Sequence, residues 1–324
     1  MKFSDIPFDK CVRVGNKQYL KDNWFSVNWL LGRYCNYSCS YCWPYASTKV
    51  KDHRPIKTII KTLDMIFEQA KERGFDKFSF SFSGGEPTLH PNFLDIVKHI
   101  NTQPYSKINL TSNCSRSLSW LKKLSKYSDS LSITASFHPE FVDREEFLEK
   151  VKFLKEIGVR LQINIVLLNE RFDEMWNHAQ YFYDNKISVQ AKIQVDYIDG
   201  NTFERSYTPD QLDKIKNGFP RHSKINYTYE LTDDSHNIYL IDNVERVVGL
   251  GFTRYKDWYC DAGYRSMIIT EPKGNIMRHF MCKDKPLGNI ETEFKLYDKP
   301  KKCITKICGS CADLKIPKWK EWKE

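Results

Sequence analysis

Three closely spaced cysteines, Cys35, Cys39 and Cys42, are the residues of this chain best suited to chemistry. Thiolates separated by three and then two residues can surround one iron–sulfur cube from a single loop, because thiolates are the usual protein ligands of such clusters. Three of them leave one iron without a protein ligand, and an open iron can bind and activate a small molecule. Thiolates at this spacing also occur in zinc sites, which is the alternative.

A second motif, Ser83-Gly84-Gly85-Glu86-Pro87, follows further along the chain. Gly-Gly by itself is often only a turn. The three-cysteine loop, with Tyr41 just before its last cysteine, followed by this glycine–acid loop resembles the radical S-adenosylmethionine (SAM) enzymes, in which a GGEP loop ends the second barrel strand. Both motifs in this order favour that family over zinc. The resemblance covers roughly residues 25–200.

The resemblance implies a cofactor and its contacts. Cys35, Cys39 and Cys42 would hold a [4Fe–4S] cluster, and SAM would bind the fourth iron through its amino and carboxylate groups. An electron from the cluster would break the sulfonium bond, and the 5′-deoxyadenosyl radical would take a hydrogen atom from the substrate, so the cofactors carry the hard chemistry. The residues implied to contact SAM are Tyr41, Gly84, Gly85, Glu86, Pro87, Ser112, Asn113 and Ser136.

The composition is that of an ordinary globular protein. The chain has 324 residues, 41% hydrophobic and 28% charged, and no apolar run approaches a membrane span. The N-terminus lacks the apolar core of a signal peptide, so we expect a reducing cytoplasm. In that compartment the ten cysteines indicate metal binding or catalysis rather than disulfides. The net charge of +9 is compatible with an anionic partner, but the lysines are spread along the chain.

Apolar periodicity predicts strands that alternate with helices from residue 24 to residue 195. The predicted strands are 24–31, 75–82, 107–111, 130–136, 159–168 and 188–195, and the predicted helices are 56–73, 92–100, 118–127, 144–157 and 172–183. Such alternation predicts an α/β fold with a parallel sheet, here a partial (β/α)6 barrel of the TIM type, as the family resemblance also implies. Every motif named above then falls at a carboxyl end of a strand, where βα barrels carry their chemistry.

The cysteines return in the C-terminal part, as Cys260, Cys282, Cys303, Cys308 and Cys311. A cysteine, a hairpin with a Pro-Lys-Gly-Asn turn, a second cysteine and a later pair are similar to the SPASM and twitch extensions of radical SAM enzymes. The shorter twitch form implies one auxiliary cluster, of the [4Fe-4S] type in that family, with Cys260, Cys282, Cys308 and Cys311 as ligands. Cys303 could replace one of them or be a free thiol, and structural zinc is the alternative for the group.

We therefore expect an N-terminal extension (1–24), a radical SAM partial barrel (25–200), a connecting region (201–256) and a twitch/SPASM-like domain (257–324). Candidate catalytic residues are His138, near the end of a strand, and the thiols of Cys114 and Cys303. Cys114 stands where many relatives have glycine. Candidate substrate contacts are Lys192, Gln194 and Asp196, which share one face of the last barrel strand.

The function expected is SAM cleavage followed by oxidation or epimerisation of a small polar molecule, such as an aminoglycoside, or by modification of a peptide. Few residues precede the first strand, which disfavours an N-terminal leader-binding domain and favours the small molecule. Epimerisation would need a thiol, Cys114 or Cys303, to return a hydrogen atom. Flavodoxin or ferredoxin would donate electrons. RNA modification ranks lower because no RNA-binding module is recognisable, and a non-catalytic iron–sulfur protein is the remaining alternative.

Overall fold

The structure is a computed structural model. It describes residues 6–42, 48–198, 201–204, 207–220, 222, 229–241, 247, 252–282, 284–308 and 311–321, with the side chains of 195–198, 201–204, 216 and 311 excepted. Among these residues, no helix is long and apolar enough to cross a membrane.

The predicted alternation of strands and helices is confirmed, with boundaries that differ by a few residues. Six parallel strands make up most of the main sheet and run to its edge at β7, in the order β2 (Trp24–Leu30), β3 (Lys77–Ser83), β4 (Ser106–Ser112), β5 (Leu131–Ser136), β6 (Arg160–Leu167) and β7 (Val189–Ile193). The crossover helices are α2 (Ile56–Glu72), α3 (Phe93–Ile100), α4 (Leu118–Leu124), α5 (Arg144–Glu156) and α6 (Phe172–Asp184). The fold is therefore α/β with a mostly parallel sheet.

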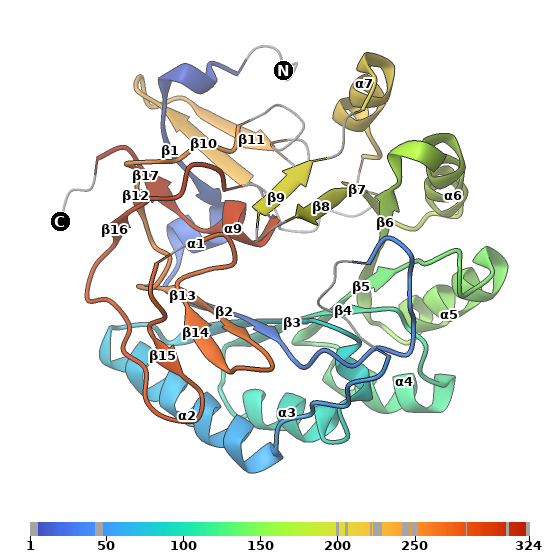
Figure 1. Ribbon diagram of the computed structural model, residues 1–324, viewed down its shortest axis with the longest axis horizontal. Helices are drawn as coiled ribbons and strands as arrows, with labels where there is room; N and C mark the ends of the chain where they lie inside the picture. Colours follow the sequence, from blue (N-terminus) through green and yellow to red (C-terminus); the bar gives the residue numbers. More distant parts are fainter. Residues whose placement is uncertain are drawn as a thin grey trace.

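The helices cover one face of this sheet, along the lower and right-hand rim in Figure 1. Each strand sends alternate side chains to that face, where they join one hydrophobic core with the buried stripes of the helices. Phe78, Phe80 and Phe82 of β3, for example, contact Phe67 of α2 or Phe93 of α3. The opposite, concave face receives the remaining side chains of each strand.

The C-terminal hairpin extends the main sheet beyond β2. β13 (Ser266–Thr270) pairs with β2 in parallel, and β14 (Asn275–Met277) and β15 (Gly288–Asn289) follow it antiparallel, so that nine described strands form one open sheet. The predicted hairpin is thus present, but it joins the barrel sheet through pairing that no local pattern reveals. The domain boundaries proposed above remain predictions.

A second sheet combines three distant parts of the chain. Its described strands are antiparallel, in the order β11 (Ile238–Ile241), β10 (Tyr229–Asp233), β1 (Cys11–Asn16), β17 (Lys318–Trp319), β12 (Tyr259–Cys260) and β16 (Lys301–Lys302). Cys11 is fully buried in the core of this sheet. The N-terminal extension and the connecting region are therefore held together with the C-terminal segment that carries the cysteines.

Short elements complete the described chain. They are the helices α1 (Lys17–Lys21), α7 (Pro209–Asn217) and α9 (Cys311–Lys315), the 3-10 turns Phe8–Lys10, Pro87–Leu89, Ser125–Tyr127 and Asn169–Arg171, and the hairpin of β8 (Val195–Ile198) with β9 (Asn201–Glu204). Thr208 caps the N-terminus of α7, because the Thr208 and Gln211 side chains form a reciprocal capping box.

Candidate active site

The three-cysteine loop leaves the carboxyl end of β2 and is fixed at its base. The backbone N–H of Arg33 donates to Asp52 Oδ1 at 2.9 Å, which joins the start of the loop to the segment that leads into α2. Cys35 and Cys39 are half-buried and Cys42 is exposed. The Cys42 N–H donates to the Cys39 carbonyl at 3.0 Å, a turn that keeps these two cysteines on one bend of the loop.

Gly84 and Gly85 allow the glycine–acid loop to lie directly on the cysteine loop. Gly85 N donates to the Gly32 carbonyl at 3.1 Å, and Glu86 N donates to the Tyr34 carbonyl at 2.8 Å. A Cβ on Gly85 would lie 2.2 Å from the Tyr34 oxygen, and one on Gly84, whose φ is +123°, would lie 2.5 Å from the Gly32 oxygen. Only glycine permits this approach, so the two sequence motifs meet through their backbones.

Glu86 holds the ends of β3 and β4 together from a buried position. Its Oε1 accepts from Thr88 N at 3.0 Å, from Thr88 Oγ1 at 2.6 Å and from Ser112 Oγ at 2.8 Å, and its Oε2 accepts from Asn113 N at 2.7 Å. Burial raises the pKa of Glu86, and these hydrogen bonds oppose the rise. The carboxylate is 2% exposed, so it acts by positioning Ser112 and Asn113 beside the loop.

Asn113 also reaches the cysteine loop. Its Nδ2 donates to Asn36 Oδ1 at 3.0 Å and lies 3.9 Å from Cys35 Sγ. Cys114 follows with a φ of +53°. Its side chain is buried in the apolar core, and burial raises its pKa to about 12. Asn36 was not predicted as a site residue, since nothing in the sequence distinguishes it from a solvent-exposed loop amide.

His138 contacts the cysteine loop from the end of β5. Its Nδ1 lies 3.3 Å from Cys39 Sγ and 3.0 Å from Tyr41 OH, and the rings of Tyr41 and His138 stack. Burial lowers the pKa of His138 to about 4, so the imidazole is neutral at pH 7. His138 and Tyr41 therefore lie against a cysteine of the loop. Next to them, Glu140 accepts hydrogen bonds from Ser40 N at 2.8 Å and Ser40 Oγ at 2.5 Å, a contact that the sequence did not reveal.

The three thiols are near enough to influence one another's ionisation. Burial raises the pKa of Cys35 to about 11 and that of Cys39 to about 12, and the charge of Cys42 contributes to both. A bound metal would reverse this effect, because coordination deprotonates a thiol outright. Three thiols on one loop, of which Cys39 is covered by Tyr41 and His138, fit the three protein ligands of a cluster with one open iron, and the backbone of the glycine loop supports the loop that carries them.

The concave face of the main sheet is polar. Ser79, Asn109, Ser132, Gln162 and Gln190 contribute hydroxyl and amide groups from five neighbouring strands, and they bond to one another at 2.6 to 3.4 Å. One layer nearer the strand ends, Asn164 is 7% exposed, and its Oδ1 has no hydrogen-bond partner among the described residues. Barrel interiors are usually filled with branched apolar residues, so this face is suited to a polar ligand.

The candidate substrate residues lie at the far edge of this face. Lys192 follows Gln190 at a spacing of two residues and shares its face, and Gln194 Oε1 accepts a hydrogen bond from Asn169 N at 3.4 Å. The side chain of Asp196 lies outside the described residues. Ser136 ends β5 opposite Asn164 of β6, which places it beside the unpartnered amide oxygen.

Four of the five C-terminal cysteines line one small cavity between the second sheet and the hairpin. They are Cys260, Cys282, Cys303 and Cys308, and the cavity wall also includes His279, Asp313 and Lys318. Burial raises the pKa of Cys260, Cys282 and Cys308. Cys303 thus lies with the predicted ligands, whereas the side chain of Cys311 is outside the described residues. Four cysteines that line one cavity provide the ligand type of a tetrathiolate metal group.

A buried polar chain joins this cavity to the barrel. His279 Nδ1 and Asp313 Oδ1 are 2.5 Å apart, and His279 Nε2 is 3.0 Å from Asn28 Nδ2 on β2. Because the Asn28 amide nitrogen can only donate, Nε2 accepts and Nδ1 carries the proton toward Asp313. No local sequence pattern predicts this connection, since these three residues are far apart along the chain. Among the described residues, no three His, Cys, Asp or Glu side chains converge tightly enough to hold a single metal ion.

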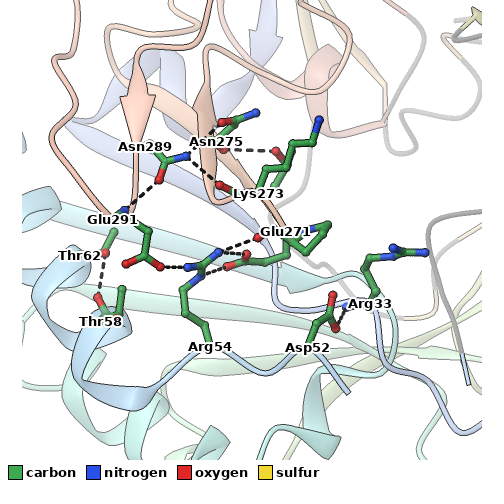
Figure 2. A network of polar contacts seen from close by, with 12 residues as sticks. Arg33, Asp52, Arg54, Thr58, Thr62, Glu271, Lys273, Asn275, Asn289 and Glu291 are labelled. Carbon is green, nitrogen blue, oxygen red and sulfur yellow. Dashed lines mark hydrogen bonds and ion pairs between the residues drawn. The ribbon is translucent and has the colours of Figure 1, made fainter. Parts of the chain in front are cut away.

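A second connection holds the segment after the cysteine loop against the hairpin (Figure 2). Arg54 donates from Nε to Glu271 Oε1 at 2.8 Å and from Nη2 to Glu271 Oε2 at 2.6 Å, and it also contacts Glu291 and the Pro272 carbonyl. The Glu271 side chain is 3% exposed and that of Arg54 12%. This ion pair fixes the chain next to Asp52, which in turn holds Arg33 at the start of the loop.

Comparisons with known proteins agree with this geometry. Residues 29–182 match the sequence family described as the Radical SAM superfamily. The chain is similar to an S-adenosylmethionine-dependent nucleotide dehydratase from Flammeovirga pacifica, with 30% identity over 177 residues, which are 48% of this chain and 59% of that protein. The chain thus spans less than two thirds of that relative's length.

Solved structures of native anSMEcpe share the fold. The one with bound AdoMet has a TM-score of 0.58 at 17% identity and covers 84% of this chain and 79% of its own. The one with AdoMet and the Cp18Cys peptide has the same TM-score at 16% identity and covers 84% and 78%. The family match covers the strands and loops that carry the three cysteines and the glycine–acid motif. Residues 29–182 therefore form a domain of the radical SAM superfamily.

Proposed function

We propose that the chain is a radical SAM enzyme that oxidises or epimerises a small polar molecule. The observation that carries the proposal is the placement of the three-thiol loop beside a polar concave face, at the carboxyl ends of β2 to β5. When bound, the cluster and SAM would supply an electron and a 5′-deoxyadenosyl radical that abstracts a hydrogen atom. A flavodoxin or ferredoxin would provide the electron.

The protein's own residues would position these groups. Glu86 sets Ser112 and Asn113 near the loop, the two glycines bring backbone amides close, and Tyr41 with neutral His138 shields Cys39 from water. The unpartnered Asn164 oxygen offers an acceptor to a donor group of SAM or of the substrate, since a buried polar atom without a partner is costly. Lys192 adds positive charge to the same face, which favours an anionic substrate.

Nucleotides are the first substrates to test, because they are polar and anionic and because the Flammeovirga relative is named a nucleotide dehydratase. The chain, reconstituted with iron and sulfide and reduced without oxygen, should form 5′-deoxyadenosine from SAM, and the correct substrate should accelerate this. Alanine at Cys35, Cys39 and Cys42 should abolish it, whereas Cys11→Ala, in the second sheet, should not. A cluster-loaded protein that forms no 5′-deoxyadenosine would favour the non-catalytic alternative, and acceleration only by peptides would favour peptide modification.

Deuterated water separates oxidation from epimerisation. If Cys114 or Cys303 returns a hydrogen atom, the product gains solvent deuterium. The structure places Cys114 in the apolar core and Cys303 in the second cavity, so oxidation is the outcome we expect. The 5′-deoxyadenosyl radical would take one hydrogen atom, and the iron–sulfur group that we propose for the second cavity would accept the second electron while a proton leaves to solvent, which gives a two-electron-oxidised product free of solvent deuterium.

For the second cavity we propose an auxiliary iron–sulfur group held by Cys260, Cys282, Cys303 and Cys308, with Cys303 in the place first given to Cys311. The support is that these four line one cavity. The test is a variant in which Cys35, Cys39 and Cys42 are replaced by alanine. If this variant still binds iron and sulfide, the proposal is supported. Zinc in their place would contradict it.

A further inference from the structure

The wall of the four-cysteine cavity contains a buried cation, Lys318. Lys318 is 1% exposed, and it pairs with Cys260 directly across the two strands β17 and β12. Directly opposed residues of neighbouring antiparallel strands have their Cβ atoms within about 5.5 Å of each other. The lysine and the cysteine therefore project from adjacent strands toward the same cavity.

The ammonium group has neutral partners. Nζ donates to the carbonyl oxygens of Asp313 at 2.6 Å and Ile316 at 2.9 Å, and it lies 5.0 Å from the centre of the Tyr255 ring. Two carboxylates lie near it, but that of Asp313 is paired with His279 and that of Asp261 with Arg265. Carbonyls and a ring polarise toward a cation but carry no net charge, and a buried charge without a counter-ion costs several kcal/mol.

The sulfurs can supply the missing negative charge. Four thiolates carry four negative charges, and the core of an oxidised iron–sulfur cluster neutralises about half of them, so the loaded site remains anionic. Reduction adds one more negative charge. A fixed positive charge in the wall thus favours the loaded site over the empty one, and the reduced site over the oxidised one.

We propose that Lys318 is the counter-charge of the group in the four-cysteine cavity and raises its reduction potential. This inference rests on the auxiliary group proposed above. Lys318 does not bind the group itself. It acts on the sulfurs through its electric field, so it is a positioning residue and not a ligand. The same argument gives the buried lysine a reason to be there, because in the empty site the nearby carboxylates of Asp261 and Asp313 are already paired with Arg265 and His279.

The experiment uses the full chain with alanine at Cys35, Cys39 and Cys42, so that the second group is observed alone. Lys318→Met, Lys318→Arg and the control Lys320→Met, which removes an exposed lysine two residues away, are compared by iron content and by redox titration followed by electron paramagnetic resonance. We expect Lys318→Met to disfavour reduction at least tenfold, which is 59 mV for a one-electron couple. Lys318→Arg and Lys320→Met should have a reduction potential and an iron content close to those of the parent chain.

Denaturation of the metal-free and loaded chains distinguishes this role from a purely structural one. Lys318→Met should leave the metal-free chain as stable as the parent or more so, and should lower the stability gained on loading. Equal destabilisation of both forms with an unchanged potential would show that Lys318 only binds the carbonyls of Asp313 and Ile316, and would overturn the proposal. A parent chain that retains no iron would overturn the auxiliary group itself, which is a separate and recognisable result.

Discussion

At the scale of single residues, the candidate site depends on buried polar groups whose partners are fixed. Glu86 accepts four hydrogen bonds from donors on two strand ends. His90 is 2% exposed, and its Nδ1 accepts from Asn92 N at 3.1 Å, which places the ring proton on Nε2, 3.1 Å from the Arg54 carbonyl. Through these hydrogen bonds, both residues fix the positions of the loops that surround the three cysteines.

Glu86→Gln tests the carboxylate. A glutamine amide must turn its NH2 group toward at least one of the N–H donors, of Thr88 or of Asn113, and so leaves a buried donor unpaired. We expect the free energy of unfolding to fall by about 2 kcal/mol and the affinity for SAM to fall with it, as measured by urea denaturation and by calorimetric titration. Glu149→Gln, at an exposed position of α5, is the matched control; equal stability of the two variants would contradict this reading.

The stability of the protein should depend on pH through His90. Burial lowers the pKa of His90 below its usual value. Because the pKa is lower in the folded than in the unfolded chain, the contribution of His90 to stability is present above the unfolded-state value of about 6.5 and is lost as the pH falls through the folded-state pKa. Wild type should lose more unfolding free energy than His90→Gln as the pH is lowered from neutral to acidic. Parallel losses in the two proteins would show that His90 does not contribute.

At the scale of elements, the loops that follow β2 and β3 work as one unit because their backbones touch. Leu31 N donates to the Ser83 carbonyl at 2.8 Å, and the bonds of Gly85 and Glu86 to the cysteine loop continue this pairing beyond the strands. The parallel register of β2 with β3 therefore sets the position of the cysteines. A substitution in the glycine loop should therefore shift the positions of the three thiols.

Gly85→Ala is the direct test of this contact. The added Cβ would meet the Tyr34 and Arg33 carbonyl oxygens at 2.2 and 2.4 Å, so the cysteine loop must move. We expect iron bound per chain to fall by more than half while the far-ultraviolet circular dichroism stays the same. Gly158→Ala is the control, because its φ is +85° but open space surrounds the new methyl group; it should cost about 1 kcal/mol of stability and no iron. Full iron loading of Gly85→Ala would refute the argument.

At the scale of the whole molecule, the C-terminal part and the barrel share a sheet and an ion pair. β13 pairs with β2, and Arg54 with Glu271 joins the start of α2 to the hairpin (Figures 1 and 2). His279 adds a hydrogen bond to Asn28 on the concave face. The four-cysteine cavity is thereby held in a fixed relation to the strands that carry the candidate active site.

Arg54→Met should destabilise the protein by about 3 kcal/mol, since it leaves the buried Glu271 carboxylate without its partner. The double variant Arg54→Met with Glu271→Met should lose less unfolding free energy than the two single variants lose together, because no unpaired charge remains. Chemical denaturation gives both quantities. Arg144→Met, which breaks an exposed pair with Glu145, should have no measurable effect. Additive losses in the double variant would mean that the two side chains do not interact.

The sequence alone determined the local elements and the first set of thiols. Period-two and helical patterns depend on neighbours along the chain, so the strands of the barrel and its crossover helices were predicted within a few residues, and the spacing of Cys35, Cys39 and Cys42 indicated their chemistry. Tertiary structure alone decided that β13 joins β2, that Cys303 lines the cavity with three predicted ligands, and that Lys318 is buried there. These outcomes depend on pairing between segments far apart in the chain, and no local pattern encodes which distant strand a residue will face.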